Sequence, residues 1–494
     1  MKYETDVLVV GMGFAGLCAA NRAAELGVKV ILIEKLSKGY WIPGGALVTS
    51  GQGIHIGGLS LMEPEATLIT AIEQATSKRA SPLMVNTYVG NAHRAIEWLK
   101  SCGVEFEEET EEEKTLKPKK EDIVNKDQWG LIKPGGKYDA TNYGGKVASE
   151  IMLSRLNTLG AKILMETSAR KLLTGAKGEV VGIVAKDKDG LFGINAKSVI
   201  LCTGGMYQNQ EMMVRYCGPQ VSQVLPYGPP GATGDGHEMA REIGAAFRHP
   251  GIVGGVRACP EDAVWNDDHY YNDLQAVAYQ GVLLDEYGDR IFDESTFVEQ
   301  KMAFQYLMKH TESVTGMIVI DRTIYEQSDI IRTIISRILE FKGTVYKANT
   351  LEEIGEQASS DEKLGLRLGR QQNLVNTIKR YNKAIEDGNN MDMRPSRKTN
   401  LNKIETPPIY AIPYTLVSIL SLGGLVVNEK AEVIDKSGYV IPGLYTAGEL
   451  MHNSIGGGPT NTLGHETSYV GCLGLCLVFG ILSAENAVSV SRQS

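Results

Sequence analysis

The chain has 494 residues, of which 43% are hydrophobic and 22% charged, and its formal net charge is −9. This length predicts two or three folding units rather than one. The negative charge argues against a nucleic-acid-binding surface, so we expect no nucleic-acid partner. The seven cysteines are odd in number and contain no C-x-x-C motif. They are typical of reduced core residues and exclude a disulfide framework, an attached haem and an iron–sulfur ligand set.

The N-terminal segment alternates between strand and helix around a glycine loop. An apolar, β-branched strand is predicted at Thr5–Val10, followed by GMGFAG at residues 11–16. A helix at Ala15–Leu26 and a second strand at Val28–Ile33 come next, and Glu34 ends the unit. A strand, a G-x-G-x-x-G loop, a helix and a strand ending in an acid form the pattern of a dinucleotide-binding unit.

Each part of this unit has a physical role in holding a dinucleotide. Gly11 permits the tight turn, and Gly13 lets the backbone approach a pyrophosphate at the N-terminus of the helix. Gly16 lets the helix pack closely on the strand. The Glu34 carboxylate lies where it can accept hydrogen bonds from both hydroxyls of an adenosine ribose. An ordinary glycine turn is the alternative, but the agreement of all the parts favours a dinucleotide site.

The predicted elements continue with a glycine-rich loop at Pro43–Gly58 and two helices. The second helix runs from Pro82, after Ser81 as N-cap, to Gly103. Further strands are predicted at 162–166, 180–186, 191–195 and 199–202, and a glycine turn opens a helix within 231–245.

The glycine-rich, strand-forming composition of the sequence ends at about residue 251 and returns after Pro407-Pro408. Helices are expected to dominate from Phe297 to Asp387, and strand-forming, glycine-rich sequence then returns. We therefore predict a discontinuous first domain at 1–251 and 406–494, with a second domain inserted at 252–405.

No membrane segment is predicted. The first strand begins almost at Met1, which leaves no room for a signal peptide. The longest apolar run, Val470–Leu482, is shorter than the about 20 residues that span a bilayer, and we interpret it as a buried C-terminal helix. We expect a cytoplasmic protein with no membrane partner.

Over nearly its whole length the chain resembles the fumarate reductase/3-ketosteroid dehydrogenase family of FAD flavoproteins. The stretches that carry the resemblance are GMGFAG with Glu34, GGALVTSG, LCTGG, ATGDGHEMAREIGA, DEYGDRIFDE, TPPIYAIP, GGLVVNEKAEVID, IPGLYTAGE and NTLGHE. The most specific is IPGLYTAGE. The resemblance implies an α/β fold. Its FAD-binding domain would be Rossmann-like, of the three-layer, glutathione-reductase-like type, and an inserted α+β domain would cap the substrate.

The resemblance also implies non-covalently bound FAD and no metal. Glu449 would hold ribityl hydroxyls, Asp235 would contact the cofactor, and the Thr462–Leu463 backbone would meet the pyrimidine edge of the flavin. Most of these are glycine-flanked residues at strand ends, where α/β sheets bind ligands. The complete expected FAD-binding set is Gly11, Gly13, Ala15, Gly16, Glu34, Lys35, Gly44, Gly45, Ser50, Gly51, Gly53, Ala169, Thr203, Gly204, Asp235, Gly448, Glu449, Thr462 and Leu463.

Departures from the family pattern bear on the substrate. Relatives that act on dicarboxylates carry Arg, His and Arg at three positions where this chain has Val298, Ile419 and Thr462. A buried dianion without cationic partners would lose several kcal/mol per carboxylate, so we expect a small neutral cyclic substrate. A shift of a few residues in the comparison is the alternative. The tyrosines of the ketosteroid dehydrogenases are absent as well, because Phe297 and Gly457 stand at their positions.

Four side chains are candidates for proton transfer. His55, His452 and His465 lie in the three flavin loops, and Tyr143 lies in a turn followed by two glycines. Histidine suits acid–base work near neutral pH. His452 is the first candidate because it follows Glu449 by three residues. For each histidine, an ordinary packed or exposed side chain is the alternative.

We therefore expect an FAD-dependent oxidoreductase that exchanges a hydride with a neutral ring substrate. Isoflavonoid reduction of the tetrahydrodaidzein-to-equol type fits best. The alternatives are a 3-ketosteroid or bile-acid reductase or dehydrogenase, a fumarate-reductase-like enoate reductase, and a non-redox flavin-dependent isomerase or lyase. The electron donor is left open between NAD(P)H and a redox protein.

Overall fold

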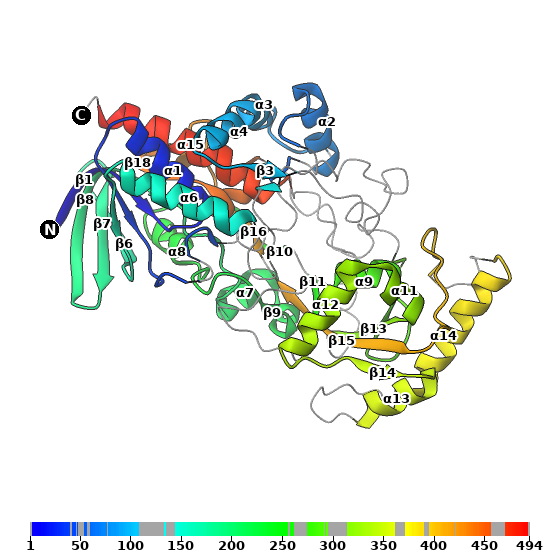
Figure 1. The fold of residues 1–494 in the computed structure, drawn as a ribbon. Helices are drawn as coiled ribbons and strands as arrows, with labels where there is room; N and C mark the ends of the chain where they lie inside the picture. The colour runs from blue at the N-terminus through cyan, green and yellow to red at the C-terminus, as the bar shows by residue number, and fades with distance from the viewer. Residues whose placement is uncertain are drawn as a thin grey trace.

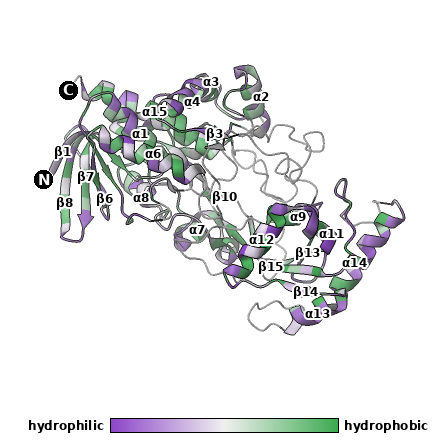
Figure 2. Cartoon of the chain, in the orientation of Figure 1, coloured by the Kyte–Doolittle hydropathy of each residue, from purple (hydrophilic) through white to green (hydrophobic). Residues whose placement is uncertain are grey.

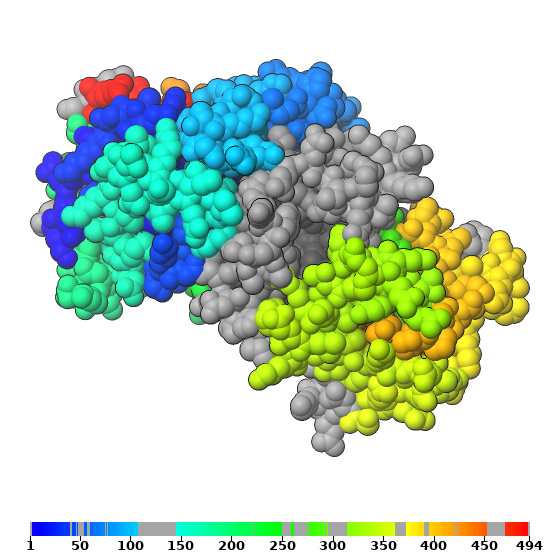
Figure 3. Space-filling model, viewed as in Figure 1, coloured from blue at the N-terminus to red at the C-terminus, as the bar shows by residue number. Residues whose placement is uncertain are grey.

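The structure is a computed structural model of the chain. It describes residues 2–39, 42–45, 47, 54–56, 60–76, 78–107, 133–134, 144–254, 257–260, 274–291, 293–294, 314–360, 371–389, 395–418, 420–455 and 470–492. The described elements gather in two lobes at opposite ends of the face shown in Figure 3.

The first lobe contains a large sheet near both termini of the chain (Figure 1). Its strands are β1 (Tyr3–Val10), β2 (Val30–Ile33), β5 (Lys162–Leu164), β6 (Ser168–Thr174), β7 (Val180–Asp187), β8 (Gly190–Leu201), β17 (Glu432–Ile434) and β18 (Val440–Thr446). The main strand order is β17-β18-β8-β1-β2-β5, and β7 pairs with β8 and β6. Strand β1 runs parallel to both neighbours, with Val9 opposite Leu32 and Ile200.

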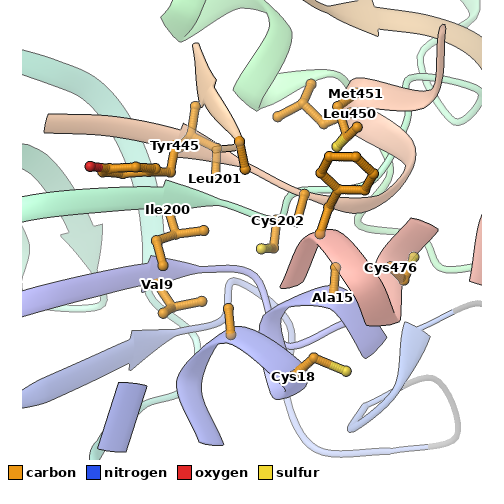
Figure 4. Packing of buried hydrophobic residues seen from close by; sticks show 14 of the residues in the cluster. Val9, Ala15, Cys18, Ile200, Leu201, Cys202, Tyr445, Leu450, Met451 and Cys476 are labelled. Atoms are coloured by element: carbon orange, nitrogen blue, oxygen red, sulfur yellow. The ribbon is translucent and has the colours of Figure 1, made fainter. Parts of the chain in front are cut away.

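Six described helices accompany this sheet in the first lobe, and the first and the last of them in the chain pack against its strands (Figure 1). They are α1 (Phe14–Glu25), α2 (Glu65–Ala75), α3 (Pro82–Gly90), α4 (Ala92–Ser101), α6 (Gly144–Thr158) and α15 (Cys472–Ser491). Helix α15 packs closely on α1, because a Cβ atom at Gly480 would lie 2.8 Å from Cβ of Cys18. Figure 4 shows Ala15 and Cys18 of α1 beside Cys476 of α15, with Val9, Ile200 and Tyr445 on three neighbouring strands.

Helix α15 is long and apolar enough to cross a membrane and is alone in this among the described helices. However, 72% of its most apolar window is buried inside the protein. Packing against α1 and the sheet therefore accounts for its composition.

The second lobe is built around a six-stranded sheet. Its strands are β9 (Leu225–Pro226), β11 (Arg257–Pro260), β12 (Val282–Asp285), β13 (Thr315–Ile320), β14 (Tyr346–Ala348) and β15 (Ile409–Ser418). Its helices are α9 (Gln275–Gln280), α11 (Arg322–Gln327), α12 (Asp329–Glu340), α13 (Leu351–Ser360) and α14 (Gln371–Glu386). Figure 2 shows mainly hydrophobic residues on β8 in the large sheet and many hydrophilic residues along α14.

Short elements lie between the two sheets. They are β3 (Phe106–Glu107), β4 (Lys133–Pro134), α7 (Gln210–Cys217), the 3₁₀ helix η2 (Pro219–Gln223), α8 (Asp235–Glu242), β10 (Phe247–Gly254), β16 (Leu420–Leu425) and the 3₁₀ helix η4 (Gly448–Ile455). Strand β10 pairs antiparallel with β16, and β16 packs against η4.

The structure corrects two sequence-based expectations. The strands expected at 191–195 and 199–202 are one strand, β8, and the helix expected at 82–103 is two helices, α3 and α4, that meet at Asn91. Strand β15 pairs with β11, β13 and β14 of the second sheet, although it lies beyond residue 405. The division into domains remains a prediction, and by strand pairing its second boundary would fall after Ser418.

Candidate functional site

A cleft opens at the carboxyl ends of β1, β2, β8 and β18, where open α/β sheets bind ligands. Most residues of the predicted FAD-binding set line it: Gly11, Gly13, Ala15, Glu34, Lys35, Gly44, Gly45, Ala169, Thr203, Gly204, Asp235, Gly448 and Glu449. Gly16 lies behind the cleft, and Ser50, Gly51, Gly53, Thr462 and Leu463 fall outside the described residues.

The three glycines of GMGFAG differ in what surrounds them. Gly11 has φ +103°, and a Cβ atom there would lie 2.4 Å from the Cys202 carbonyl oxygen. A Cβ atom at Gly16 would lie 1.9 Å from the Gly11 carbonyl oxygen. At Gly13, by contrast, a Cβ atom would meet nothing within 4 Å and would project into open space. Gly11 and Gly16 therefore serve the turn and the packing of α1, whereas Gly13 leaves the cleft side clear for a ligand.

Glu34 is buried at the end of β2 and is held by backbone donors. Its Oε2 accepts the Met12 N–H at 2.8 Å, and its Oε1 accepts the Leu36 N–H at 2.9 Å. Burial raises the pKa of the Glu34 carboxyl, and these N–H groups act in the opposite direction. Each carboxylate oxygen keeps a further lone pair for a donor in the cleft.

Glu449 is the second buried acid of the cleft. Its Oε1 accepts the Ser421 N–H at 2.7 Å and the Ser421 hydroxyl at 3.1 Å. Burial raises the pKa of the Glu449 carboxyl to about 7. Gly205 leaves room for it, because a Cβ atom at Gly205 would lie 2.0 Å from Oε1 of Glu449.

A salt bridge joins β2 to α8 across the cleft. The Lys35 ammonium lies 2.7 Å from Oδ2 of Asp235 and donates to the Thr233 hydroxyl at 2.6 Å. The Thr233 hydroxyl in turn donates to Oδ1 of Asp235 at 2.8 Å. Two of the predicted FAD-binding residues, Lys35 and Asp235, thus hold each other in place.

The described residues fit a dinucleotide such as FAD. The buried Thr203 hydroxyl has no hydrogen-bond partner within the described part of the chain, which is costly unless a ligand supplies one. Cβ atoms at Gly13 and Gly204 would meet nothing within 4 Å, so the backbone there is open to a bulky polar group. Gly13 also begins α1, and a helix N-terminus attracts phosphate.

Of the four candidate proton-transfer side chains, the described structure places His55 alone. His55 is buried but does not line the cleft, and its carbonyl oxygen packs on Gly471 at the start of α15. His452 belongs to η4, but its side chain is outside what the structure describes. Tyr143 and His465 also lie outside the described residues, as do Val298, Ile419 and Thr462.

Sequence reasoning missed several residues of the site, including four with polar or sulfur-containing side chains. Tyr207, Cys472 and Cys476 line the cleft, and Ser421 bonds to Glu449. The two cysteines could have been found from their spacing, because residues four apart share one face of a helix. No local pattern marked Ser421 or Tyr207.

Comparison with known proteins identifies the family of the chain and its cofactor. The chain matches the FAD binding domain family over residues 6–464. It is 26% identical to the urocanate reductase of Eggerthella lenta over 504 residues, covering 99% of this chain and 75% of that protein. It is 24% identical to the vinyl phenol reductase of Lactiplantibacillus plantarum over 523 residues, covering 99% and 97%.

The fold is similar to that of a flavocytochrome c3 fumarate reductase in its open conformation. The TM-score is 0.76 at 23% identity, covering 99% of this chain and 79% of that one. This similarity confirms the predicted fold class, and the family match confirms FAD as the cofactor. The chain belongs to the FAD binding domain family and is an FAD-dependent oxidoreductase.

Proposed function

We propose that the chain reduces a neutral ring substrate of the isoflavonoid type, as in the conversion of tetrahydrodaidzein to equol. The observation that carries the proposal is the absence of positive charge at Val298, Ile419 and Thr462, where relatives that act on dicarboxylates carry Arg, His and Arg. A pocket without these cations suits a substrate that brings no carboxylate into it.

FAD, when bound and reduced, supplies a hydride and so carries the electron chemistry. In the proposed reaction the substrate carbon gains this hydride, and its hydroxyl leaves as water after taking up a proton. The chain's own part is to orient the ring, exclude water and deliver that proton. His452 is our first candidate for the proton, because it lies on η4 three residues after Glu449.

Reduction of a conjugated C=C bond in a neutral phenol is a second candidate. The relative named vinyl phenol reductase matches almost end to end, with 99% of this chain and 97% of that protein covered. A vinyl phenol carries no carboxylate, which agrees with the uncharged positions named above. In this reaction the two carbons of the double bond gain the hydride and the proton, and nothing leaves.

The test is flavin reoxidation under anaerobic conditions. The purified chain is photoreduced and mixed separately with tetrahydrodaidzein, a vinyl phenol, a 3-keto-4-ene steroid and fumarate, and the return of oxidised flavin absorbance is recorded. We expect tetrahydrodaidzein to reoxidise the flavin fastest and fumarate to leave it reduced. Rapid reoxidation by fumarate would refute the neutral-substrate proposal and would direct attention to Arg248 and Arg257 as carboxylate partners.

A further inference from the structure

Tyr207 stands in the cleft on the loop between β8 and α7, and its backbone is fixed on both sides. The Met206 N–H donates to the Ser421 hydroxyl at 3.1 Å. The Gln208 N–H donates to the Ala232 carbonyl at 3.0 Å. Tyr207 lines the cleft and is only 2% exposed. Its position is therefore set by its neighbours and not by its own hydroxyl.

The ring of Tyr207 packs against the backbone of Gly228. A Cβ atom at Gly228 would lie 2.6 Å from the Tyr207 hydroxyl oxygen and 3.1 Å from its Cε2 atom. Gly228 also has φ +135°, a backbone conformation that side chains other than hydrogen rarely allow. The Gln208 side-chain amide holds Gly228 in place by donating a hydrogen bond to its carbonyl oxygen at 3.0 Å.

Among the described residues, no side chain or backbone group forms a hydrogen bond with the Tyr207 hydroxyl. A phenol at the wall of a cleft that bonds to no protein group is available to a ligand. Burial, followed by the nearby Glu449 and Cys472, raises the pKa of Tyr207 well above its ordinary value. The phenol therefore keeps its proton and is available as a donor.

We propose that Tyr207 is a further FAD-holding residue, whose hydroxyl donates a hydrogen bond to the polar chain that links the flavin ring to the pyrophosphate. That chain offers hydroxyl and phosphate oxygens as acceptors. The proximity of Tyr207 to Glu449, the acid expected at the ribityl hydroxyls, places it beside this part of the cofactor. The inference depends on FAD binding in the cleft and is independent of the substrate proposed above.

Removing the Tyr207 hydroxyl distinguishes a role in FAD binding from a purely structural role, because the two roles predict different effects on FAD affinity and on thermal stability. In the FAD-free protein, Tyr207→Phe removes no hydrogen bond, so its thermal midpoint should equal that of the wild type. FAD titrated into the same FAD-free protein and followed by flavin fluorescence should bind roughly tenfold more weakly, the loss expected for one hydrogen bond.

Tyr414→Phe is the matched control. Tyr414 is equally buried, but its hydroxyl donates to the Leu284 carbonyl at 3.1 Å in the second sheet, away from the cleft. This variant should lower the thermal midpoint of the FAD-free protein and leave FAD affinity unchanged. The proposal is overturned if Tyr207→Phe binds FAD as tightly as the wild type, or if it lowers the FAD-free midpoint as Tyr414→Phe does. Unchanged FAD affinity with altered turnover would assign Tyr207 to the substrate instead and would equally overturn it.

Discussion

The Ser421 hydroxyl donates a hydrogen bond to the Glu449 carboxylate at 3.1 Å, and the Ser421 N–H donates to the same oxygen at 2.7 Å. The same hydroxyl accepts the Met206 N–H at 3.1 Å. One serine on β16 therefore ties the 3₁₀ helix η4 to the loop after β8. Both of these segments line the FAD cleft.

Ser421→Ala should loosen both segments. The substitution removes one of the donors to Glu449 and the acceptor for Met206, so we expect a loss of about 1–3 kcal/mol in unfolding free energy and weaker FAD binding. Urea unfolding and FAD titration measure the two effects. Ser483→Ala is the control, because this buried hydroxyl bonds only to the Gly480 carbonyl of its own helix at 2.9 Å. Equal unfolding free energies and equal FAD affinities in the two variants would contradict the role given to Ser421.

Glu34→Ala should release FAD. The substitution removes the carboxylate expected to accept hydrogen bonds from the adenosine ribose, and a hydrogen bond to a charged group contributes roughly 1.5–3 kcal/mol. The measurement is the flavin content of the purified protein and the dissociation constant for added FAD. Glu4→Ala on the exposed side of β1 is the control and should keep FAD. A Glu34→Ala protein that is purified with full flavin would show that this acid does not hold the cofactor.

The local sequence predicted the N-terminal unit closely, because each of its constraints lies within a few residues of the glycines. Strand β8 was wrongly divided in two because Lys197 and Ser198 interrupt its apolar pattern. Ser198 is nevertheless fully buried, and its hydroxyl donates to the Ala487 carbonyl of α15 at 3.4 Å. A partner 289 positions away along the chain cannot be recognised from spacing.

The same limit applies to the site. Glu34 and Glu449 could be predicted as residues of the cleft because each closely follows a strand and lies near glycines. The role of Ser421 could not be predicted, because it depends on hydrogen bonds with Met206 and Glu449, and these residues come together only in the folded chain. Tyr207 was missed for the same reason, since Gly228 and Ala232 come to it from a separate loop.

Two buried groups should give the FAD-free protein opposing pH dependences. Burial raises the pKa of Glu449 from 4.5 to about 7, so the native state binds this proton more tightly. The stability that results is present below pH 4.5 and is lost as the pH rises through 7. Burial lowers the pKa of His237 from 6.5 to about 4. Its contribution is present above pH 6.5 and is lost as the pH falls through 4.

Substituting one of the two groups at a time should reveal the effect of the other on how the unfolding free energy changes with pH. Glu449→Gln should make the FAD-free protein lose stability more steeply on acidification from pH 6.5 to 4.5, because only the His237 effect remains. His237→Gln should give the reverse trend, with stability falling as the pH rises from 4.5 to 7. Each effect is on the order of 3 kcal/mol, measurable by urea unfolding at several pH values. A wild-type pH profile in both variants would show that neither group titrates as described.

His452→Ala should slow turnover and keep FAD bound. We expect a loss on the order of a hundredfold or more in steady-state rate, the usual effect of removing an acid–base group, with an unchanged flavin spectrum. His93→Ala is the matched control, because His93 is exposed on α4 with a ring nitrogen 3.2 Å from the Glu63 carbonyl oxygen, and it should keep full activity. If His452→Ala kept nearly the full rate, the residue would be structural. The proton would then be sought at His55, His465 and Tyr143 by the same pair of measurements.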